Sequence, residues 1–160
     1  MSEPDILLTR IDNRLIHGQV GITWTKTIGT NLLLLVDDDV AQDGVLQQIM
    51  TLTAKQAGVD VRFWTVEKTI STIHKASPQQ HIFIVVKTPH VARQLVEGGV
   101  KLGEINVGNM HFSEGKWSIS TKVYVNQQDL DDLRALEDAG CNVYIQDVPG
   151  DKKESIVYQH

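Results

Sequence analysis

Short apolar segments alternate with segments of helical period along most of this chain, and this alternation is the feature that most constrains its fold. Segments with the length and composition of strands lie at residues 5–11, 32–37, 59–65, 81–87, 105–108, 122–125 and 141–148. The segment 32–37 is apolar at successive positions, which is typical of a strand that is covered on both faces. The alternation predicts one α/β domain over residues 1–160, built on an open, doubly wound, mostly parallel sheet with helices on both faces.

The segments between the strands carry signals of helix ends and turns. Helical patterns bounded by capping residues or glycine lie at residues 45–57, 88–99 and 126–140, and another helix is expected to begin near Gly18. The polar segment 109–121 contains a Ser-Glu-Gly-Lys turn, which predicts a hairpin and therefore an antiparallel pair at one edge of the sheet. The polar residues 151–160 are expected to form a loose tail or a short helix.

Charge and cysteine content exclude several classes of protein. The net charge is −5 and the basic residues are scattered, which argues against a nucleic-acid partner. Cys141 is the single cysteine, so the chain cannot form an internal disulfide and suits a reducing compartment. The first ten residues lack the basic start and apolar core of a signal peptide, and the apolar runs are far shorter than a membrane span. We therefore expect a cytoplasmic protein.

The motifs of several familiar chemistries are absent from the sequence. There is no GxGxxG after a strand, no phosphate-binding P-loop, no HExxH zinc motif and no GxSxG hydrolase motif. The acidic run 37–39 offers oxygen ligands, but a solvated acidic loop is the more frequent outcome of such a run. Cys141 opens an expected strand, where an inert thiol is the usual finding. The sequence therefore predicts neither a metal site nor a cofactor.

The segment RIDNRLIHGQV, residues 10–20, is the strongest candidate for a functional site. The first strand is expected to end near Ile11 and the next helix to begin near Gly18 or Gln19, so Asp12 to His17 form a loop at the carboxyl edge of the sheet. Open α/β sheets bind ligands at this edge, and helix N-termini there offer N–H groups to anions.

The side chains of this loop are suited to the handling of phosphate. His17 can act as a nucleophile, and Arg14 supplies a positive fork that matches phosphate oxygens. Asp12 can accept a hydrogen bond from one imidazole nitrogen, which leaves the other nitrogen free to react. Gly18 has no side chain that would obstruct a phosphoryl donor, and the expected phosphate-binding positions are Gly18, Gln19 and Asn13. From composition alone, an inert loop histidine beside a surface Asp12–Arg14 ion pair is the more frequent arrangement.

The same segment resembles the active-site signature of the IIB components of the mannose-fructose-sorbose family of bacterial sugar phosphotransferase systems. The resemblance continues through LVEGGV (95–100) and INVGNMHFSEGK (105–116) and covers nearly the whole chain. VRFWT (61–65) and NVGNMH (106–111) are most similar to the N-acetylgalactosamine/galactosamine branch of the family. Agreement in two separate blocks reverses the preference for an inert histidine.

The resemblance implies a phosphocarrier enzyme with a phosphohistidine at His17. A phosphorylated IIA component would donate the phosphoryl group, and the chain would pass it to N-acetylgalactosamine, galactosamine or a related hexose taken up by the IIC/IID membrane permease. It further implies no cofactor, a homodimer, and a transient association with the inner face of the membrane through the permease. Asn13 stands where relatives often carry an acid, which leaves open the group that orients the ring.

Several questions stay open at this level, among them the identity of the sugar and the oligomeric state. Asn109 and His111 are expected either to line the pocket or to form a structural turn, and neither imidazole nitrogen of His17 is favoured for phosphorylation. The alternative to a phosphocarrier is a non-catalytic α/β regulatory module that binds a phosphorylated ligand at the Arg14–His17 loop. A hydrolase is disfavoured, because no second acid or base at a usable spacing accompanies His17.

Overall fold

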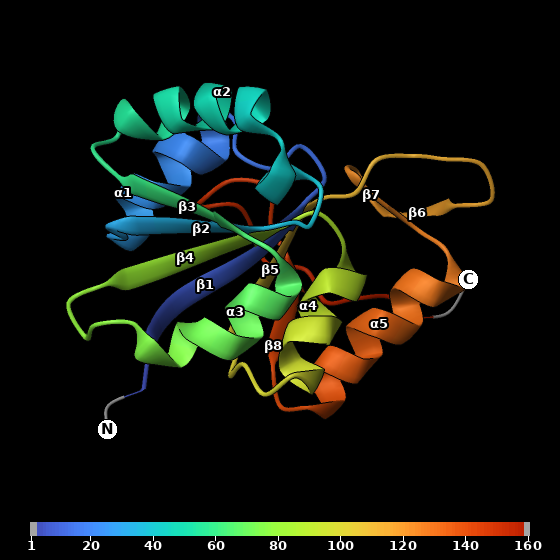
Figure 1. Cartoon of the computed structure of the whole chain (residues 1–160). Helices are drawn as coiled ribbons and strands as arrows, with labels where there is room; N and C mark the ends of the chain where they lie inside the picture. The colour runs from blue at the N-terminus through green and yellow to red at the C-terminus, as the bar shows by residue number, and fades with distance from the viewer. Residues whose placement is uncertain (1–2, 159–160) are drawn as a thin grey trace.

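A parallel sheet forms the centre of the computed structural model, which describes residues 3–158 (Figure 1). Its six strands have the order β3-β2-β4-β1-β5-β8. Their bounds are β1 (Asp5–Asp12), β2 (Leu32–Val36), β3 (Asp60–Trp64), β4 (His81–Val86), β5 (Glu104–Asn109) and β8 (Asn142–Ile145). Every pairing within this sheet is parallel, so the prediction of a mostly parallel, doubly wound sheet is confirmed.

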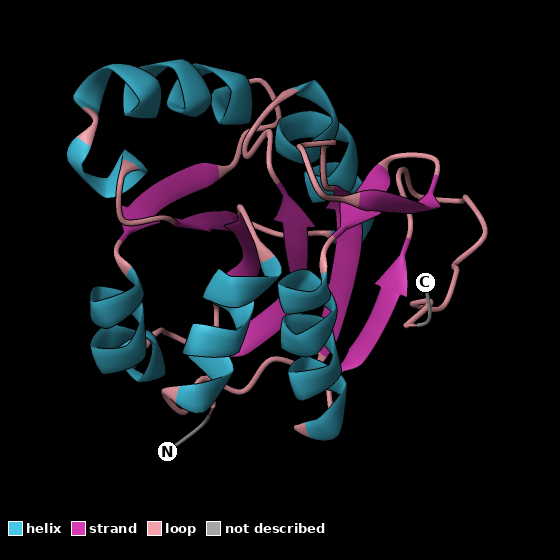
Figure 2. Ribbon diagram, turned by 90° about the vertical axis from the view of Figure 1, so that its right-hand side faces the viewer, coloured by secondary structure: helices cyan, strands magenta, loops and turns pink. Residues whose placement is uncertain are grey.

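Helices cover both faces of the sheet (Figures 1 and 2). One face carries η1 (Gln19–Trp24), α1 (Thr25–Ile28) and α2 (Gly44–Lys55), and the other carries α3 (Val66–Thr72), α4 (Pro89–Glu97) and α5 (Gln127–Asp138). Two short 3₁₀ turns, η2 (Val40–Gln42) and η3 (Ile73–Lys75), complete the connections. No helix within residues 3–158 is both long enough and apolar enough to cross a membrane.

The two helical layers explain why strand β2 is apolar at every position. Leu33 and Leu35 pack in the cluster of buried residues on the side of η1 and α2, whereas Leu32, Leu34 and Val36 pack in the cluster on the side of α4 and α5. Successive side chains of a strand point to opposite faces, so a strand between two layers needs apolar residues at odd and even positions alike.

Capping residues define the helix starts, as the sequence predicts for two of them. The Thr88 hydroxyl accepts from the Val91 N–H at the start of α4, and Asn126 and Asp129 form a reciprocal capping box at the start of α5. The sequence pattern did not predict α3, which follows β3 after a single capping residue, Thr65. Two turns or fewer of helix leave too short a periodic pattern to recognise.

The predicted hairpin forms, but outside the main sheet (Figure 1). Strands β6 (Trp117–Ser120) and β7 (Val123–Val125) pair antiparallel as a separate two-stranded sheet, which a bridge between Met110 and Val123 joins to the end of β5. The Ser-Glu-Gly-Lys turn is present, with the Lys116 N–H donating to the Ser113 carbonyl over 3.1 Å. The strands nevertheless reverse after it, at residues 121–122. Residues 122–125 are therefore not a strand of the main sheet.

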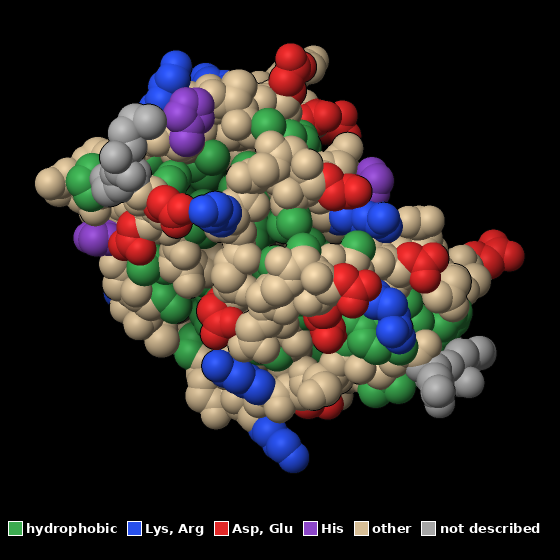
Figure 3. Space-filling view, turned by 90° about the horizontal axis from the view of Figure 1, so that it is seen from below, with side chains coloured by type: hydrophobic (Ala, Val, Ile, Leu, Met, Phe, Trp, Pro, Cys, Tyr) green, Lys and Arg blue, Asp and Glu red, His purple; other side chains and the backbone are tan. Residues whose placement is uncertain are grey.

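Residues 154–158 pack back onto the domain, so the prediction of a loose tail or short helix is wrong for the described residues, and residues 159–160 lie outside them. Glu154 pairs antiparallel with Ile145 of β8, and Ile156 is buried in the core. Apolar residues at 156 and 158 among polar neighbours supply the burial that holds this segment in place. On the face of the molecule in Figure 3, acidic and basic side chains are interspersed, with hydrophobic groups visible between them.

Candidate active site

The loop between β1 and η1 lies at the carboxyl edge of the sheet, at a point where the chain changes direction. β1 lies between β4 and β5. It is followed by η1 on one face of the sheet, whereas β4 is followed by α4 on the other face. Connections that diverge in this way open a crevice beyond the strand ends, where open α/β sheets bind their ligands.

The loop is held in a strained conformation by its own apolar side chains. Leu15 has φ 62°, in the left-handed region that leucine seldom adopts, and its N–H donates to the Asp12 carbonyl over 3.0 Å. This backbone conformation costs about 1–2 kcal/mol. Burial of Leu15 and Ile16, which are 6% and 5% exposed, offsets that cost because each buried side chain of this size contributes about 1.5–3 kcal/mol. The turn directs the chain back toward the end of β1, where His17, two residues after Leu15, contacts Asp12.

Asp12 is the centre of a buried network of charged side chains. It is completely buried as the last residue of β1. Its Oδ2 accepts hydrogen bonds from His17 Nε2 at 3.1 Å, Arg14 Nη2 at 3.0 Å and Arg10 Nε at 3.2 Å. Its Oδ1 accepts from the Arg14 backbone N–H at 2.9 Å and from Arg14 Nε at 3.1 Å. One carboxylate therefore joins three side chains from the strand and the loop.

The network keeps Asp12 ionised. Burial by itself would raise the pKa of this carboxyl group, but hydrogen bonds from His17 and Arg14 and the charge of Arg10 outweigh it, and the pKa lies well below its usual range. An ionised carboxylate only accepts hydrogen bonds, so the facing nitrogen of His17 must be the donor.

This contact defines the two nitrogens of the His17 ring. Nε2 carries the hydrogen that Asp12 accepts, so in the neutral ring Nδ1 carries the lone pair. The side chain is 23% exposed, and no described residue forms a hydrogen bond to Nδ1. The His17 carbonyl accepts from the Gly21 N–H at 2.6 Å, which ties the residue to η1. The geometry presents Nδ1 as the nitrogen available for reaction.

The structure brings Asp12, Arg14 and His17 together and places the other candidate residues around them. Asn13 contacts the end of β5 instead of the ring: Asn109 Nδ2 donates to Asn13 Oδ1 at 2.5 Å, and the Asn13 N–H donates to the Asn109 carbonyl at 3.1 Å. His111 is exposed, two residues beyond β5. The remaining phosphate-binding candidates adjoin the ring in sequence: Gly18 is exposed, and Gln19 begins η1, with a side chain that lies outside the described part of the chain.

Sequence reasoning missed Arg10, which is completely buried and contacts Asp12 directly. The signal was present, because an arginine inside an apolar strand must find buried partners. The spacing was also informative, since residues two apart on a strand point to the same face.

We expect Gly18→Ala to slow phosphoryl transfer to the chain without lowering the stability of the protein. Gly18 has φ −50°, and a Cβ there would meet no atom within 4 Å. The variant should therefore be as stable as the parent or more stable by about 0.5–1 kcal/mol, measured by urea unfolding. If Gly18 leaves room for a phosphoryl donor, transfer to the chain should slow by about tenfold. Gly44→Ala, also with no atom within 4 Å, is the matched control and should leave transfer unchanged; equal rates in all three proteins would show that the space at Gly18 is not used.

The chain belongs to the sorbose subfamily of phosphotransferase-system IIB components, since the model of that family matches residues 6–158. It is 62% identical to the N-acetylgalactosamine-specific phosphotransferase enzyme IIB component 1 of Escherichia coli K12, over 98% of this chain and 99% of the relative. Component 2 from the same organism is 46% identical over 91% of this chain and 92% of the relative. The crystal structure of E. coli component 1 superposes with a TM-score of 0.93, over 95% of this chain and 99% of that one.

The family defines the class of activity. IIB components are phosphotransferases that accept a phosphoryl group from a IIA component and transfer it to a sugar. They work with IIA and with IIC/IID permease partners. The resemblance seen in the sequence is therefore confirmed, and the regulatory-module alternative is not supported.

Proposed function

We propose that this chain is the IIB phosphocarrier of an N-acetylgalactosamine-specific phosphotransferase system, and that His17 carries the phosphoryl group. The observation that supports this assignment is the bond between His17 Nε2 and the buried carboxylate of Asp12, which leaves Nδ1 as the nucleophile. Phosphoryl transfer needs positioning and charge neutralisation more than covalent chemistry from the protein, and this loop offers both.

In the first step, the Nδ1 lone pair of His17 attacks the phosphorus atom carried by the IIA partner. The bond from phosphorus to Nδ1 forms while the bond to the IIA group breaks, and that group keeps the electron pair. The imidazole ring then bears hydrogen on Nε2 and phosphorus on Nδ1 and is positively charged. Asp12, ionised and 3.1 Å from Nε2, stabilises this charge and holds the ring in place.

In the second step, a hydroxyl oxygen of the sugar attacks the same phosphorus atom. The bond between phosphorus and Nδ1 breaks, its electron pair returns to Nδ1, and the hydroxyl proton is released. His17 is again the neutral ring with hydrogen on Nε2. Because the ring is restored without a change at Asp12, the same geometry serves both halves of the cycle.

Arg14 is proposed to neutralise the transferring group. Its Nη2 and His17 Nε2 share Asp12 Oδ2, so the guanidinium lies beside the imidazole, and the side chain is 38% exposed. A guanidinium at this place matches the oxygens of a phosphoryl group in geometry and charge. Gly18 leaves space, and N–H groups near Gln19 are additional donors. Asn109, bonded to Asn13, is proposed to support the wall of the pocket, and His111 to lie at its rim.

Membership of the family supports a proposal about partners and location. We propose that the chain acts in the cytoplasm, receives the phosphoryl group from IIA, and associates transiently with the inner face of the membrane through the IIC/IID permease. We also propose a homodimer. Light scattering on the purified protein tests the last point, with a mass twice the chain's 17.9 kDa as the expected result and 17.9 kDa as the contradicting one.

The sugar specificity is supported by two relatives, 62% and 46% identical, that are both named for N-acetylgalactosamine. The test is a reconstituted system with labelled phosphorylated IIA, this chain, and membranes that contain the matching permease. Label should move first to the chain and then to N-acetylgalactosamine, and mannose offered in its place should remain unlabelled. Label that reaches mannose equally would contradict the specificity. A chain that binds phosphate without covalent label would contradict the phosphocarrier assignment itself.

A further inference from the structure

We propose that Arg10 and Gly108 form a buried positioning pair that fixes the Asp12 carboxylate and, through it, the orientation of the His17 ring. The inference rests on the proposed function of His17. It concerns residues that contact no reacting group, so their effect on transfer must pass through Asp12.

Arg10 is fully buried, which is unusual for a charged residue. Its side chain is 0% exposed, and its guanidinium lies 5.1 Å from the centre of the Trp24 ring. Nη1 donates to Asn106 Oδ1 at 2.6 Å and to the Gln146 carbonyl at 3.2 Å. Nε donates to Asp12 Oδ2 at 3.2 Å. Burial of a charge costs several kcal/mol, and it is tolerated only when such partners are in place.

Gly108 supplies the space that the guanidinium occupies. A Cβ at position 108 would lie 2.0 Å from Arg10 Cζ and 2.2 Å from Nη2, closer than any real contact. The backbone of Gly108 does not have a positive φ, so its conformation does not require glycine. The glycine of β5 is therefore needed for the arginine of β1, the neighbouring strand.

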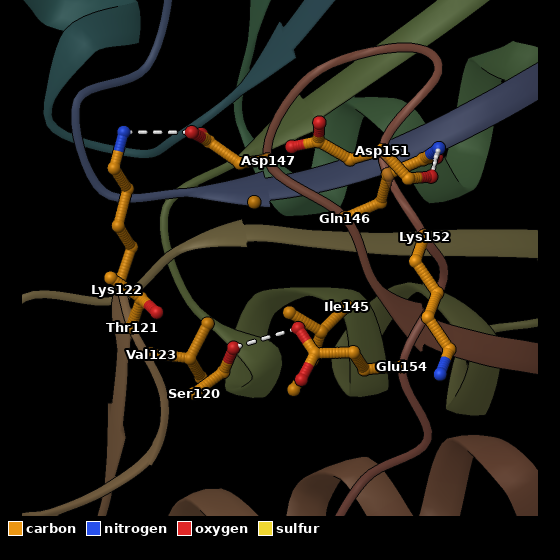
Figure 4. Close-up of a pocket in the computed structure, with 11 residues that line it drawn as sticks. Ser120, Thr121, Lys122, Val123, Ile145, Gln146, Asp147, Asp151, Lys152 and Glu154 are labelled. Atoms are coloured by element: carbon orange, nitrogen blue, oxygen red, sulfur yellow. Dashed lines mark hydrogen bonds and ion pairs between the residues drawn. The ribbon is translucent and has the colours of Figure 1, made fainter.

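A second acid also lies near the guanidinium, at the nitrogen that is 3.1 Å from Asp12 Oδ2. Asp147 Oδ1 lies 3.9 Å from Arg10 Nη2, and its backbone carbonyl accepts from Trp24 Nε1 at 3.2 Å. The other carboxylate oxygen accepts from Lys122 Nζ at 2.7 Å, beside a cleft of about 350 Å³ (Figure 4). Arg10 Nη2 is thus near both Asp12 and Asp147, and the side chain cannot shift without breaking contacts to β5, to η1 or to the segment after β8.

This arrangement restrains the one oxygen on which the His17 contact depends. Asp12 Oδ2 is approached by Arg10, Arg14 and His17. Arg14 is partly exposed and binds both carboxylate oxygens, so it would draw the carboxylate toward itself if Arg10 were absent. The Nε2 contact would then lengthen, and either ring nitrogen could carry the hydrogen. Arg10 therefore selects one tautomer of the His17 ring.

The test compares Arg10→Lys, Arg10→Gln and Gly108→Ala with a matched control, Gly103→Ala, whose Cβ would meet no atom within 4 Å. Nitrogen-15 NMR of the unphosphorylated proteins reports the His17 tautomer, and labelled phosphorylated IIA gives the rate of transfer. We expect hydrogen on Nε2 in the wild type and in Gly103→Ala. In Arg10→Gln and Gly108→Ala we expect mixed tautomers and a rate lower by about 10- to 100-fold, the loss typical of supporting groups around a site. Arg10→Lys should lie between them.

A wild-type tautomer and rate in folded Arg10→Gln or Gly108→Ala would overturn the proposal. If both of those variants fail to fold, Arg10→Lys decides, because it keeps the charge but not the fork; wild-type values in it would equally overturn the role of the guanidinium. The tautomer is measured without any partner. Failure of IIA to phosphorylate the wild type would therefore refute the proposed function while leaving the positioning role to be judged by NMR alone.

Discussion

The variant His17→Gln is expected to lose all transfer of phosphoryl groups from labelled IIA. A glutamine amide can occupy much of the space of the imidazole and can donate to Asp12, but its nitrogen has no lone pair available for attack on phosphorus. The fold should persist, because the side chain lies in a loop and is 23% exposed. The measurement is the covalent label that survives alkaline electrophoresis and is released by acid. Unfolding in urea should show a change of no more than about 1 kcal/mol.

Two controls make this result specific. His74→Gln replaces an exposed histidine of η3, outside the site loop, and should keep the full label. Cys141 is buried and burial raises the pKa of its thiol, which disfavours the thiolate that a phosphocysteine would need. Label retained in His17→Gln, or lost in Cys141→Ala, would contradict the assignment of the phosphoryl group to His17.

Asp12→Asn is expected to affect both activity and stability. The amide has the shape of the carboxylate but removes the negative charge between Arg10 and Arg14, and loss of one partner from a buried ion pair typically costs about 3–5 kcal/mol. Transfer should fall by roughly 100- to 10,000-fold, because the ring loses its orientation and the positive phosphoimidazole loses its counter-ion. Urea unfolding and transfer rates at neutral pH measure the two effects. A variant with the wild-type rate of transfer would show that Asp12 contributes only to the stability of the fold.

The same substitution should remove a pH dependence. The pKa of Asp12 is lowered in the folded protein, so its contribution to stability is complete above the unfolded pKa, near 4, and is lost as the pH falls from there toward the folded value. Acidification from pH 6 to pH 3 should therefore reduce the stability difference between wild type and Asp12→Asn. Asp60→Asn, at an exposed carboxylate, is the control substitution. A difference that stays constant across this range would contradict the assigned ionisation of Asp12.

The pattern of apolar runs was sufficient to predict the sheet and the site loop, because each depends on residues near in sequence. Apolar residues at every position of β2 predict burial on both faces, and Asn13 to His17 must follow the first strand wherever that strand lies in the sheet. The chain end was mispredicted because its order depends on a bridge to Ile145 in β8, a contact that no local pattern contains.

Details of the site depended on contacts between distant segments. The choice of ring nitrogen follows from the contact between His17 Nε2 and Asp12, made across a left-handed turn at Leu15 that the sequence gives no reason to expect at a leucine. The need for glycine at position 108 is apparent only in the folded protein. There β5 lies beside β1, and the Arg10 side chain fills the place of the missing Cβ. Asn13 and Asn109 likewise meet only across these two strands. The sequence was therefore sufficient to propose His17 as the reactive residue, while the orientation of its ring required the fold.

Phosphorylation of Nδ1 of His17 is tested most directly by locating the phosphoryl group on the ring. The wild-type chain, labelled with nitrogen-15 in its histidine rings, is phosphorylated by its IIA partner and examined by nitrogen and phosphorus NMR. We expect phosphorus bonded to Nδ1 of His17, with hydrogen retained on Nε2 where Asp12 accepts it. Phosphorus on Nε2 of His17, or on any other residue, would contradict it.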